Sequence, residues 1–233
     1  MNKTCIINYA EACWWKGGGT WYPQGQARLV QSLKDTGNSD LTCFAWKNAD
    51  ELGCPSHADV PYAFKPYALQ RAKEDGYELV LWCDASVWAI KNIQPVFDHL
   101  AKHSHLFFHN SNIGRFTSDA CLDGFNLSRD KAMNMDGLMG ICMGFNLTMP
   151  VTQEFLQQWL AKAKDGFSFP GTWNNDQQQV SKDPRCVAHR HDQSVASIIA
   201  CNLGMKTVIG PETFFTYYEP TMPDCVVLTA RGM

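Results

Sequence analysis

Three side chains in the first half of the sequence could together hold a phosphorylated ligand: Lys65, Asp84 and Ser86. Asp84 and Ser86 directly follow the apolar run Leu79–Cys83, and on an extended backbone they would point to the same side. A carboxylate and a hydroxyl are oxygen ligands of the kind that Mg²⁺ or Mn²⁺ takes, and such a cation can carry a diphosphate. Lys65 stands near the start of a predicted helix, where an anion is also favoured. The alternative is that Asp84 and Ser86 only cap the next element and that Lys65 is a solvated surface residue.

A second group of titratable side chains occupies four consecutive positions: His189, Arg190, His191 and Asp192. The apolar residues that follow predict a buried helix ending at Gly204, so the group stands at or near a helix start. Asp192 could act as a base towards an acceptor hydroxyl or hold the acceptor or the sugar. Arg190 or a histidine could bind phosphate, and His191 could complete a metal site. A single histidine is most simply a structural hydrogen-bonding residue, but this concentration of groups favours a functional site.

An aromatic and glycine-rich segment follows the first predicted strand, Cys5–Tyr9. Gly17 and Gly18 could let backbone amides approach a phosphate or a sugar, although the segment matches neither the dinucleotide-binding fingerprint nor the P-loop. Trp14 and the aromatic residues near it could stack on a base or a sugar ring. The alternative is a flexible surface loop whose tryptophans tuck into the domain. Because so many exposed aromatic side chains are costly without a ligand, we expect a ligand-facing loop.

Strands and helices alternate along the chain and must position these groups. Short apolar runs predict further strands over 41–46, 79–83, 105–109, 139–147 and 207–209, and an aromatic segment follows at 214–218. Helical spacing predicts helices over 26–33, 64–75, 93–100, 128–135, 153–164 and 195–203. The segments 48–62 and 167–184 are expected to be loops. This order predicts one α/β domain whose ligand lies beyond the carboxyl ends of the strands, at the 84–86 turn.

The composition is that of an ordered globular chain: 233 residues, of which 45% are hydrophobic and 18% are charged. The formal net charge of −3 and the lack of a Lys/Arg block argue against a nucleic-acid-binding protein, although they leave room for a local basic groove. Ten scattered cysteines without a CxxC pair predict free thiols in a reducing cytoplasm. No apolar run is long enough for a membrane span and the N-terminus lacks the features of a secretory signal, so we expect a cytoplasmic protein.

Three longer segments extend these observations, namely FKPYALQRAKEDGYELVLWCDASV, MGFNLTMPVTQEFLQQW and HRHDQSVASIIACNLGM. In this order they resemble the nucleotide-sugar-dependent glycosyltransferases of the GT-A fold, over most of residues 60 to 205. In that group a helix with a Lys-Pro pair precedes a strand ending in a DxD-type motif, a glycine-rich strand lines the acceptor side, and a late His…Asp-Gln segment closes the site. The resemblance implies a single-domain, Rossmann-like mixed sheet flanked by helices over residues 1–233. Residues 1 to about 110 would bind the donor, and about 111 to 233 the acceptor.

The resemblance also implies roles for individual residues. Asp84 and Ser86 take the DxD positions, here Asp-Ala-Ser, and would bind Mn²⁺ or Mg²⁺ with a nucleoside diphosphate. Asp192 and Gln193 would lie at the reacting centre. The residues that would face the sugar or the acceptor are Gly144, Phe145 and Asn146. Serine at the third DxD position implies a weaker metal site, and the late His-x-x-Gly-x-x-Lys-Pro signature of the glycogenin-like group is absent, so the resemblance does not decide between retention and inversion at the anomeric carbon.

We therefore expect a metal-assisted hexosyltransferase that takes its sugar from a nucleotide sugar, in the first instance a UDP-sugar. The acceptor hydroxyl would belong to a glycan or small molecule, or to a 5-hydroxymethylpyrimidine base of phage DNA, for which Trp14 or Trp88 could supply a stacking partner. Two other classes stay open. A metal-dependent phosphoesterase would use Asp84, His189, His191 and Asp192 as ligands. A carbohydrate-binding module would use the tryptophans and would need neither Asp84 nor the HRHDQ segment.

Overall fold

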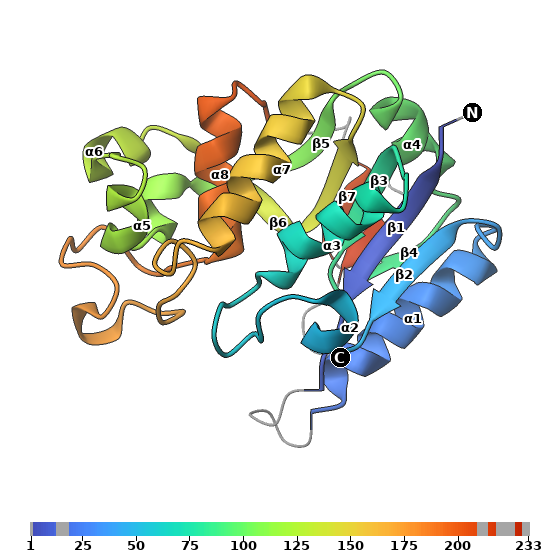
Figure 1. The fold of residues 1–233 in the computed structure, drawn as a ribbon, viewed down its shortest axis with the longest axis horizontal. Coiled ribbons are helices and arrows are strands. Elements are labelled where there is room, and N and C mark those ends of the chain that lie inside the picture. The colour runs from blue at the N-terminus through green and yellow to red at the C-terminus, as the bar shows by residue number, and fades with distance from the viewer. Residues whose placement is uncertain (1, 13–18, 209–213, 218–226, 230–233) are drawn as a thin grey trace.

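A five-stranded mixed sheet with the strand order β2-β1-β3-β6-β5 forms the centre of the structure (Figure 1). Its strands are β1 (Thr4–Tyr9), β2 (Thr42–Trp46), β3 (Leu79–Cys83), β5 (His105–Asn112) and β6 (Asp136–Asn146). β1 pairs in parallel with β2 and β3, whereas β6 runs antiparallel to both β3 and β5. The structure is a computed structural model, and it describes residues 2–12, 19–208, 214–217 and 227–229.

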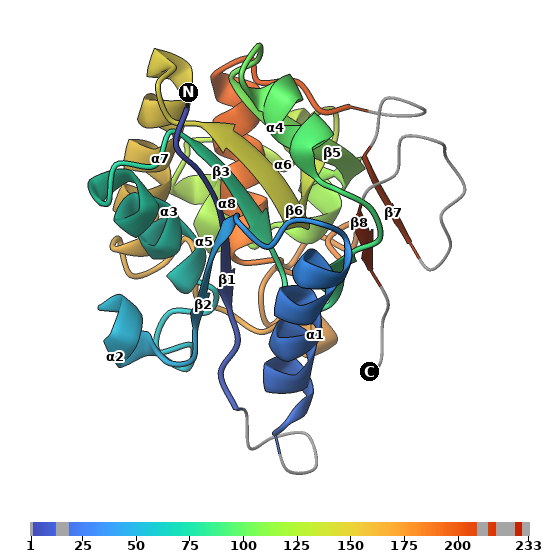
Figure 2. The same cartoon turned by 90° about the vertical axis from the view of Figure 1, so that its right-hand side faces the viewer.

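Helices cover both faces of this sheet (Figures 1 and 2). One face packs against α3 (Phe64–Glu74), α7 (Pro150–Ala163) and α8 (Asp192–Asn202), and the other packs against α1 (Trp21–Asp35) and α4 (Gln94–Leu100). A small sheet with the order β4-β8-β7 lies on the side of α1 and α4; its strands are β4 (Val87–Ala89), β8 (Val227–Thr229) and β7 (Phe215–Tyr217). The predicted class, one α/β domain with a mixed sheet flanked by helices, is confirmed.

The side chains of β3 alternate between the two faces of the sheet. Val80 and Trp82 belong to the hydrophobic cluster beneath α3, α7 and α8, and Leu79, Leu81 and Cys83 belong to the cluster beneath α1 and α4. All five side chains are buried, so the continuous apolar run reflects a strand covered on both sides. By the same alternation, the residue after Cys83 lies on the face of Trp82.

Most predicted elements lie within a few residues of the observed ones, and two differences have clear local causes. Helix α1 begins at Trp21, five positions before the predicted start, because Pro23 is tolerated in a first helical turn. The predicted loop 48–62 contains the short helix α2 (Ala49–Leu52), whose start is capped by Asn48: its side chain accepts a hydrogen bond from the Glu51 amide. An Asn followed three residues later by Glu was the signal for this helix.

The segment between β5 and β6 and the segment between α7 and α8 form a lobe beside the main sheet, on the left in Figure 1. The first contains the 3-10 turn η1 (Ile113–Phe116) and the helices α5 (Asp119–Asp123) and α6 (Arg129–Ala132); the second contains the 3-10 turn η2 (Asp176–Gln178). In place of the predicted strand 207–209, Val208 forms a single bridge with Phe108, and residue 209 lies outside the described residues.

The described part of the chain holds no helix that is both long and apolar enough to cross a membrane. It contains eight cysteines, all with free thiols. Five of them are buried: Cys5, Cys83, Cys121 and Cys142 belong to the two hydrophobic clusters, and Cys186 is the fifth. These thiols fill core volume as small apolar groups.

Candidate active site

A buried lysine joins the two acidic residues singled out in the sequence. The Lys65 Nζ lies 3.3 Å from Asp84 Oδ1 and 3.0 Å from Asp192 Oδ2, and it donates a hydrogen bond to the carbonyl oxygen of Gly140 at 2.8 Å. Lys65 and Asp192 are each 4% exposed at the side chain, whereas Asp84 is 29% exposed. The structure thus brings the end of β3 and the start of α8 together through the ammonium group of α3.

Four elements hold this ion-paired group in place. Asp84 continues β3 on the face of Trp82, and the Trp82 Nε1 donates to Asp84 Oδ1 at 2.7 Å. Lys65 stands in the first turn of α3, and Asp192 is the first residue of α8. β6 contributes Gly140, whose amide donates a hydrogen bond to Gln193 Oε1 at 3.2 Å. A Cβ at Gly140 would lie 3.3 Å from the Lys65 ammonium and from Gln193 Cβ and 3.4 Å from Asp192 Oδ2, so a larger residue here would shift these side chains.

The charges in the group shift one another's protonation equilibria. Burial alone would lower the pKa of Lys65, but the two carboxylates outweigh it and hold the pKa above its usual value. Burial raises the pKa of Asp192 to about 6, although Lys65 counters part of this effect. Burial also raises the pKa of Asp84, against the opposing effects of Lys65 and the Trp82 indole. The Lys65 ammonium, 3.0 Å away, is the ion-pair partner of Asp192 Oδ2.

Two residues next to this group have strained backbones. Tyr62 has a φ of 62° and His191 has φ and ψ of 46° and −113°, conformations that side chains other than glycine seldom adopt. Their rings stack on each other at 5.5 Å with an interplanar angle of 27°. Strain of this kind persists only where the surrounding structure imposes it, and it concentrates at functional sites.

The two histidines of the predicted cluster differ in what they leave available. His189 Nδ1 accepts from the Ser118 amide, so its Nε2 must donate to the carbonyl oxygen of Phe169, and both ring nitrogens are used. His191 Nδ1 donates to the same carbonyl at 2.8 Å, which leaves Nε2 with its lone pair. Burial lowers the pKa of His189 to about 3 and that of His191 to about 4, so both are neutral at pH 7.

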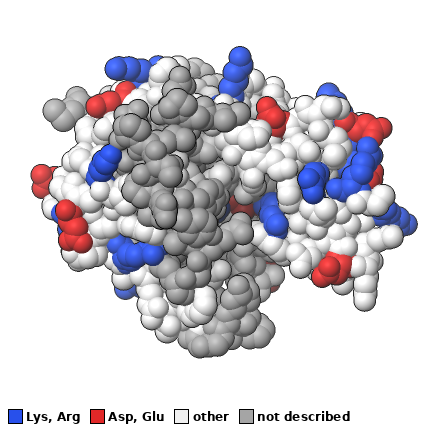
Figure 3. All heavy atoms as spheres, turned by 180° about the vertical axis from the view of Figure 1, so that it is seen from behind, with Lys and Arg blue, Asp and Glu red and all other residues white. Residues whose placement is uncertain are grey.

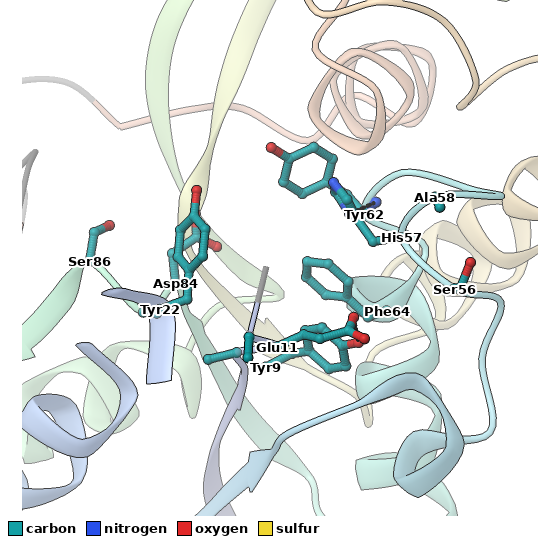
Figure 4. A pocket seen from close by; sticks show the side chains of 13 residues that line it. Tyr9, Glu11, Tyr22, Ser56, His57, Ala58, Tyr62, Phe64, Asp84 and Ser86 are labelled. Carbon is teal, nitrogen blue, oxygen red and sulfur yellow. Dashed lines mark hydrogen bonds between the residues drawn. The ribbon is translucent and has the colours of Figure 1, made fainter. Parts of the chain in front are cut away.

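A cavity of about 430 Å³ opens beyond the carboxyl ends of β1 and β3, with Asp84 in its wall (Figure 4). Figure 4 shows His57, Tyr62 and Phe64 on one side of the cavity and Ser86 on the other. Phe64 stacks on Tyr9 with ring centroids 4.2 Å apart. The other lining residues are Ala10, Glu11, Ala12, Tyr22, Ser56, Ala58 and Ala85. The cavity is therefore lined by aromatic side chains and by two carboxylates, Glu11 and Asp84.

The fold and this site can now be compared with known proteins. No family model and no curated protein matches the chain. Among solved structures, it is similar to a glycosyltransferase involved in the glycosylation of the major capsid of PBCV-1, with a TM-score of 0.55 and 14% identity over 98% of this chain and 94% of that one. It is also similar to the apo structure of the bifunctional glycosyltransferase WbbM, with a TM-score of 0.53 and 9% identity over 100% of this chain and 46% of that one. The chain has the GT-A fold.

Within the GT-A fold of this chain, the Asp-Ala-Ser motif is a turn rather than an extended segment. The Val87 amide donates to the carbonyl oxygen of Asp84 at 2.9 Å, so Ala85 and Ser86 lie inside a tight turn. The expectation that Asp84 and Ser86 point to the same side of an extended backbone is therefore wrong. Ser86 still lines the cavity, and its carbonyl oxygen accepts a hydrogen bond from Arg28.

The residues expected to face the sugar or the acceptor from β6 lie elsewhere. Asn146 pairs with Leu79 at the amino end of β3, so Gly144, Phe145 and Asn146 stand at the end of the sheet opposite Asp84. All three are buried: Phe145 is part of the core, and the Asn146 side chain donates to the Leu100 carbonyl. The register of the antiparallel pair places Gly140, not Gly144, at the site. The assignment of these three residues to an acceptor surface is thus corrected.

The other predicted residues have definite surroundings or lie outside the described residues. Trp88 is on β4, where the Arg28 guanidinium lies 3.8 Å from its ring centroid. The guanidinium of Arg190 lies 3.8 Å from the ring centroid of Trp173, so it contacts an aromatic side chain that the sequence had not singled out. Trp14, Gly17 and Gly18 fall outside the described residues.

Sequence reasoning missed the aromatic wall of the cavity. Tyr9 and Glu11 could have been predicted from the sequence. The rule that singled out Asp84 at the carboxyl end of β3 applies equally to the end of the parallel strand β1. Tyr62 gave no comparable signal, since its positive φ and its contact with His191 depend on tertiary packing.

The oxygen ligands in the cavity fit a divalent cation that binds together with a diphosphate. Asp84 would hold a divalent cation from the protein side, with the Ser86 hydroxyl in the same cavity. Among the described residues there is no group of three or more His, Cys, Asp or Glu side chains placed to bind a metal. Mg²⁺ in particular commonly takes one or two carboxylates and completes its shell with phosphate oxygens and water. The residues present therefore fit a metal–diphosphate complex better than a permanently bound ion.

Proposed function

We propose that this protein is a glycosyltransferase that moves a hexose from a nucleotide sugar to a hydroxyl acceptor. The observation that carries the proposal is the Lys65-bridged pair of Asp84 and Asp192 beside an aromatic cavity at the carboxyl ends of parallel strands. In α/β sheets this edge is where ligands bind. The GT-A fold shared with two solved glycosyltransferases supports the same activity.

The cavity is assigned to the donor. Its volume of about 430 Å³ is within the range of small-molecule sites. The stacked pair of Tyr9 and Phe64 offers an aromatic surface for a nucleobase, and Asp84 supplies the oxygen ligand for the cation of a diphosphate. A divalent cation bound there would neutralise the negative charge that develops on the departing nucleotide. The first half of the chain, up to about residue 110, would thus bind the donor, with a UDP-sugar as the first to test.

Asp192 and Gln193 are assigned to binding the reacting sugar and the acceptor. The second half of the chain, from about residue 111, would bind the acceptor. The buried Asp192 carboxylate is paired with Lys65 through Oδ2, and its remaining lone pairs could accept a hydrogen bond from a sugar or acceptor hydroxyl. A pKa of about 6 leaves Asp192 mostly ionised at pH 7, and near enough to neutrality to exchange a proton with a hydroxyl. Lys65 keeps the carboxylates ionised and fixed, and His191 Nε2 is a further neutral acceptor beside them.

The alternatives fit the geometry less well. A phosphoesterase would need His189 as a metal ligand, but both of its ring nitrogens are engaged by backbone groups. A carbohydrate-binding module would have no use for the buried charges of Lys65 and Asp192, since burying charges costs desolvation energy unless they are paired. For a DNA acceptor, the face shown in Figure 3 carries Asp and Glu as well as Lys and Arg side chains, and the formal net charge of −3 does not favour binding to phosphates.

A donor screen tests the proposal. Thermal unfolding is followed with UDP-, GDP- and CDP-hexoses, with and without Mn²⁺; a donor at about a hundred times its Kd stabilises the protein by about 2.7 kcal/mol. The hydrolysis and transfer rates of Asp84→Asn and Asp192→Asn are then measured, with Asp98→Asn on the exposed face of α4 as the control. We expect Asp84→Asn to weaken metal-dependent donor binding and Asp192→Asn to reduce turnover more than donor affinity in calorimetry. If no nucleotide sugar raises the melting temperature and none is cleaved, the proposed function is wrong.

A further inference from the structure

A row of aromatic rings leads from the donor cavity to the surface of the lobe. Phe64 lies 5.8 Å from Tyr62, and Tyr62 lies 5.5 Å from His191. His191 is in turn 5.7 Å from Trp173, which also lies 6.1 Å from Tyr62. The row passes the Lys65 group, since the Lys65 Nζ is 5.5 Å from the Tyr62 ring. Its outer end, Trp173, is 47% exposed.

Trp173 is held in a fixed position despite this exposure. The Arg190 guanidinium lies 3.8 Å from its ring centroid and also faces Phe116 at 5.4 Å. The carbonyl oxygen of Trp173 accepts a hydrogen bond from the His189 amide, and the next residue, Asn174, forms a β-bridge with Ala188. A large aromatic side chain kept exposed and fixed next to a reactive site is a prepared contact surface, because ordering it in advance lowers the entropy cost of binding.

The loop around Trp173 presents amide groups to solvent. Asn175 fixes the loop from inside: its side chain accepts from the amides of Val180 and Ser181 and donates to the carbonyls of Ser181 and Cys186. Gln177 and Gln178 take positive φ values of 54° and 59°. The exposed amide residues of the loop are Asn174, Gln177, Gln178 and Gln179. Amides both donate and accept hydrogen bonds, which matches the mixed requirement of sugar hydroxyls.

We propose that Trp173, with Tyr62 behind it, forms the acceptor subsite and that the acceptor is a saccharide. The pyranose ring would pack its C–H face on the Trp173 indole, and its hydroxyls would bond to the amides of the 174–179 loop. This assignment rests on the proposed glycosyl transfer, because it places the acceptor next to Asp192 at the inner end of the aromatic row.

Two arginines of the lobe are ion-paired, which weighs against nucleic-acid binding through them. Arg185 pairs with Asp130 at 2.7 Å and with Asp183 at 2.6 Å, and Arg129 pairs with Asp119 at 2.5 Å. Nucleic-acid binding depends on cations that neutralise phosphates, and these arginines already have carboxylate partners. A hydroxymethylated DNA duplex therefore serves as the competing acceptor in the test.

The test separates acceptor recognition from donor chemistry. Trp173→Ala and Trp173→Tyr are compared with Phe167→Ala, which removes an aromatic side chain of similar exposure, 44%, from the same lobe. Three quantities are measured: donor hydrolysis without acceptor, the KM for a panel of methyl hexopyranosides and maltotriose, and saccharide binding by NMR without donor. We expect Trp173→Ala to raise the saccharide KM at least tenfold and to weaken saccharide binding equally, with a smaller effect on donor hydrolysis. Trp173→Tyr should retain part of the affinity, and Phe167→Ala should behave as the wild type.

Each outcome bears on one proposal or both. If Trp173→Ala leaves the saccharide KM and binding unchanged, or if only the DNA duplex accepts sugar, the saccharide subsite is wrong and the transferase activity stands. If saccharides bind through Trp173 but no nucleotide sugar is cleaved, the subsite stands as a binding site and the proposed transfer is wrong. If neither saccharide binding nor donor cleavage occurs, both are overturned.

Discussion

Replacing Lys65 by methionine tests the central interaction of the site. Methionine keeps much of the length and apolar volume of lysine, so the packing of α3 against the sheet is disturbed little, but the charge is lost. The two carboxylates 3.3 and 3.0 Å away, one of them 4% exposed, would then lack their counter-ion. Removing one partner from a buried ion pair costs about 3–5 kcal/mol of stability. We expect Lys65→Met to lose an amount in this range at pH 7.

The loss should depend on pH with a defined sign. Burial already raises the pKa of Asp192 to about 6, and without Lys65 it would rise further. A carboxyl whose pKa is raised in the folded state lowers stability as pH increases from its unfolded value near 4 up to its folded pKa. The variant would lose stability over a wider pH range than the wild type, at about 1.4 kcal/mol per additional pKa unit. Its destabilisation should therefore be smaller at pH 5 than at pH 7.

Urea denaturation followed by circular dichroism, at both pH values, measures these effects. The matched control is Arg71→Met on the same helix, which removes an exposed ion pair with Asp75 at 3.3 Å and should cost less than about 1 kcal/mol. The double variant Lys65→Met/Asp192→Asn should recover part of the loss, with a coupling energy of about 1–3 kcal/mol. A cost for Lys65→Met no greater than that for Arg71→Met, or strictly additive effects in the double variant, would refute the ion-paired group as a structural unit.

Two further predictions follow from the same geometry. Because Asp192 must be ionised to accept a proton or a sugar hydroxyl, and its pKa is about 6, kcat/KM should fall roughly tenfold per pH unit below about pH 6; a flat profile from pH 5 to 8 would contradict this role. Gly140→Ala should reduce transfer at least tenfold with little effect on the melting temperature, since its Cβ would press on Lys65 and Gln193 at 3.3 Å. Gly144→Ala, whose Cβ would meet Leu100 and Leu106 at 3.0 Å in the core, should do the reverse, and the melting temperatures and transfer rates of the two variants decide the point.

Local sequence was sufficient to locate β3 and the acidic turn after it. Five consecutive apolar residues, bounded by Gly76 and Asp84, could only be a short buried strand, and the strand found is Leu79–Cys83. The start of α8 at Asp192 was also predictable, because an apolar helical segment follows directly. These are features of neighbouring residues, for which periodicity and composition carry the information.

Strand register could not be read in the same way. The glycine-rich strand β6 offers Gly137, Gly140 and Gly144, and the sequence gives no reason to prefer one of them as the residue at the site. The antiparallel pairing of Cys142 with Cys83 decides it, since this register sets Gly140 beside Lys65 and sends Gly144 to the far end of the sheet. Register is a property of two strands, and its determinants lie in side-chain packing on both faces.

By itself, the sequence determined the α/β class and the central strand. It also determined the two charged groups, one directly after that strand and one at the start of the late helix. Only the tertiary structure decided that one lysine pairs with both aspartates and that His189 is hydrogen-bonded to the backbone. It also decided that Tyr62, His191 and Trp173 form one aromatic row. The physical reason is that ion pairs and ring contacts depend on distances between segments far apart in the sequence, such as those of Lys65 and Asp192 or of Tyr62 and His191. Local propensities fix each segment, whereas burial and strand register fix the distances between them.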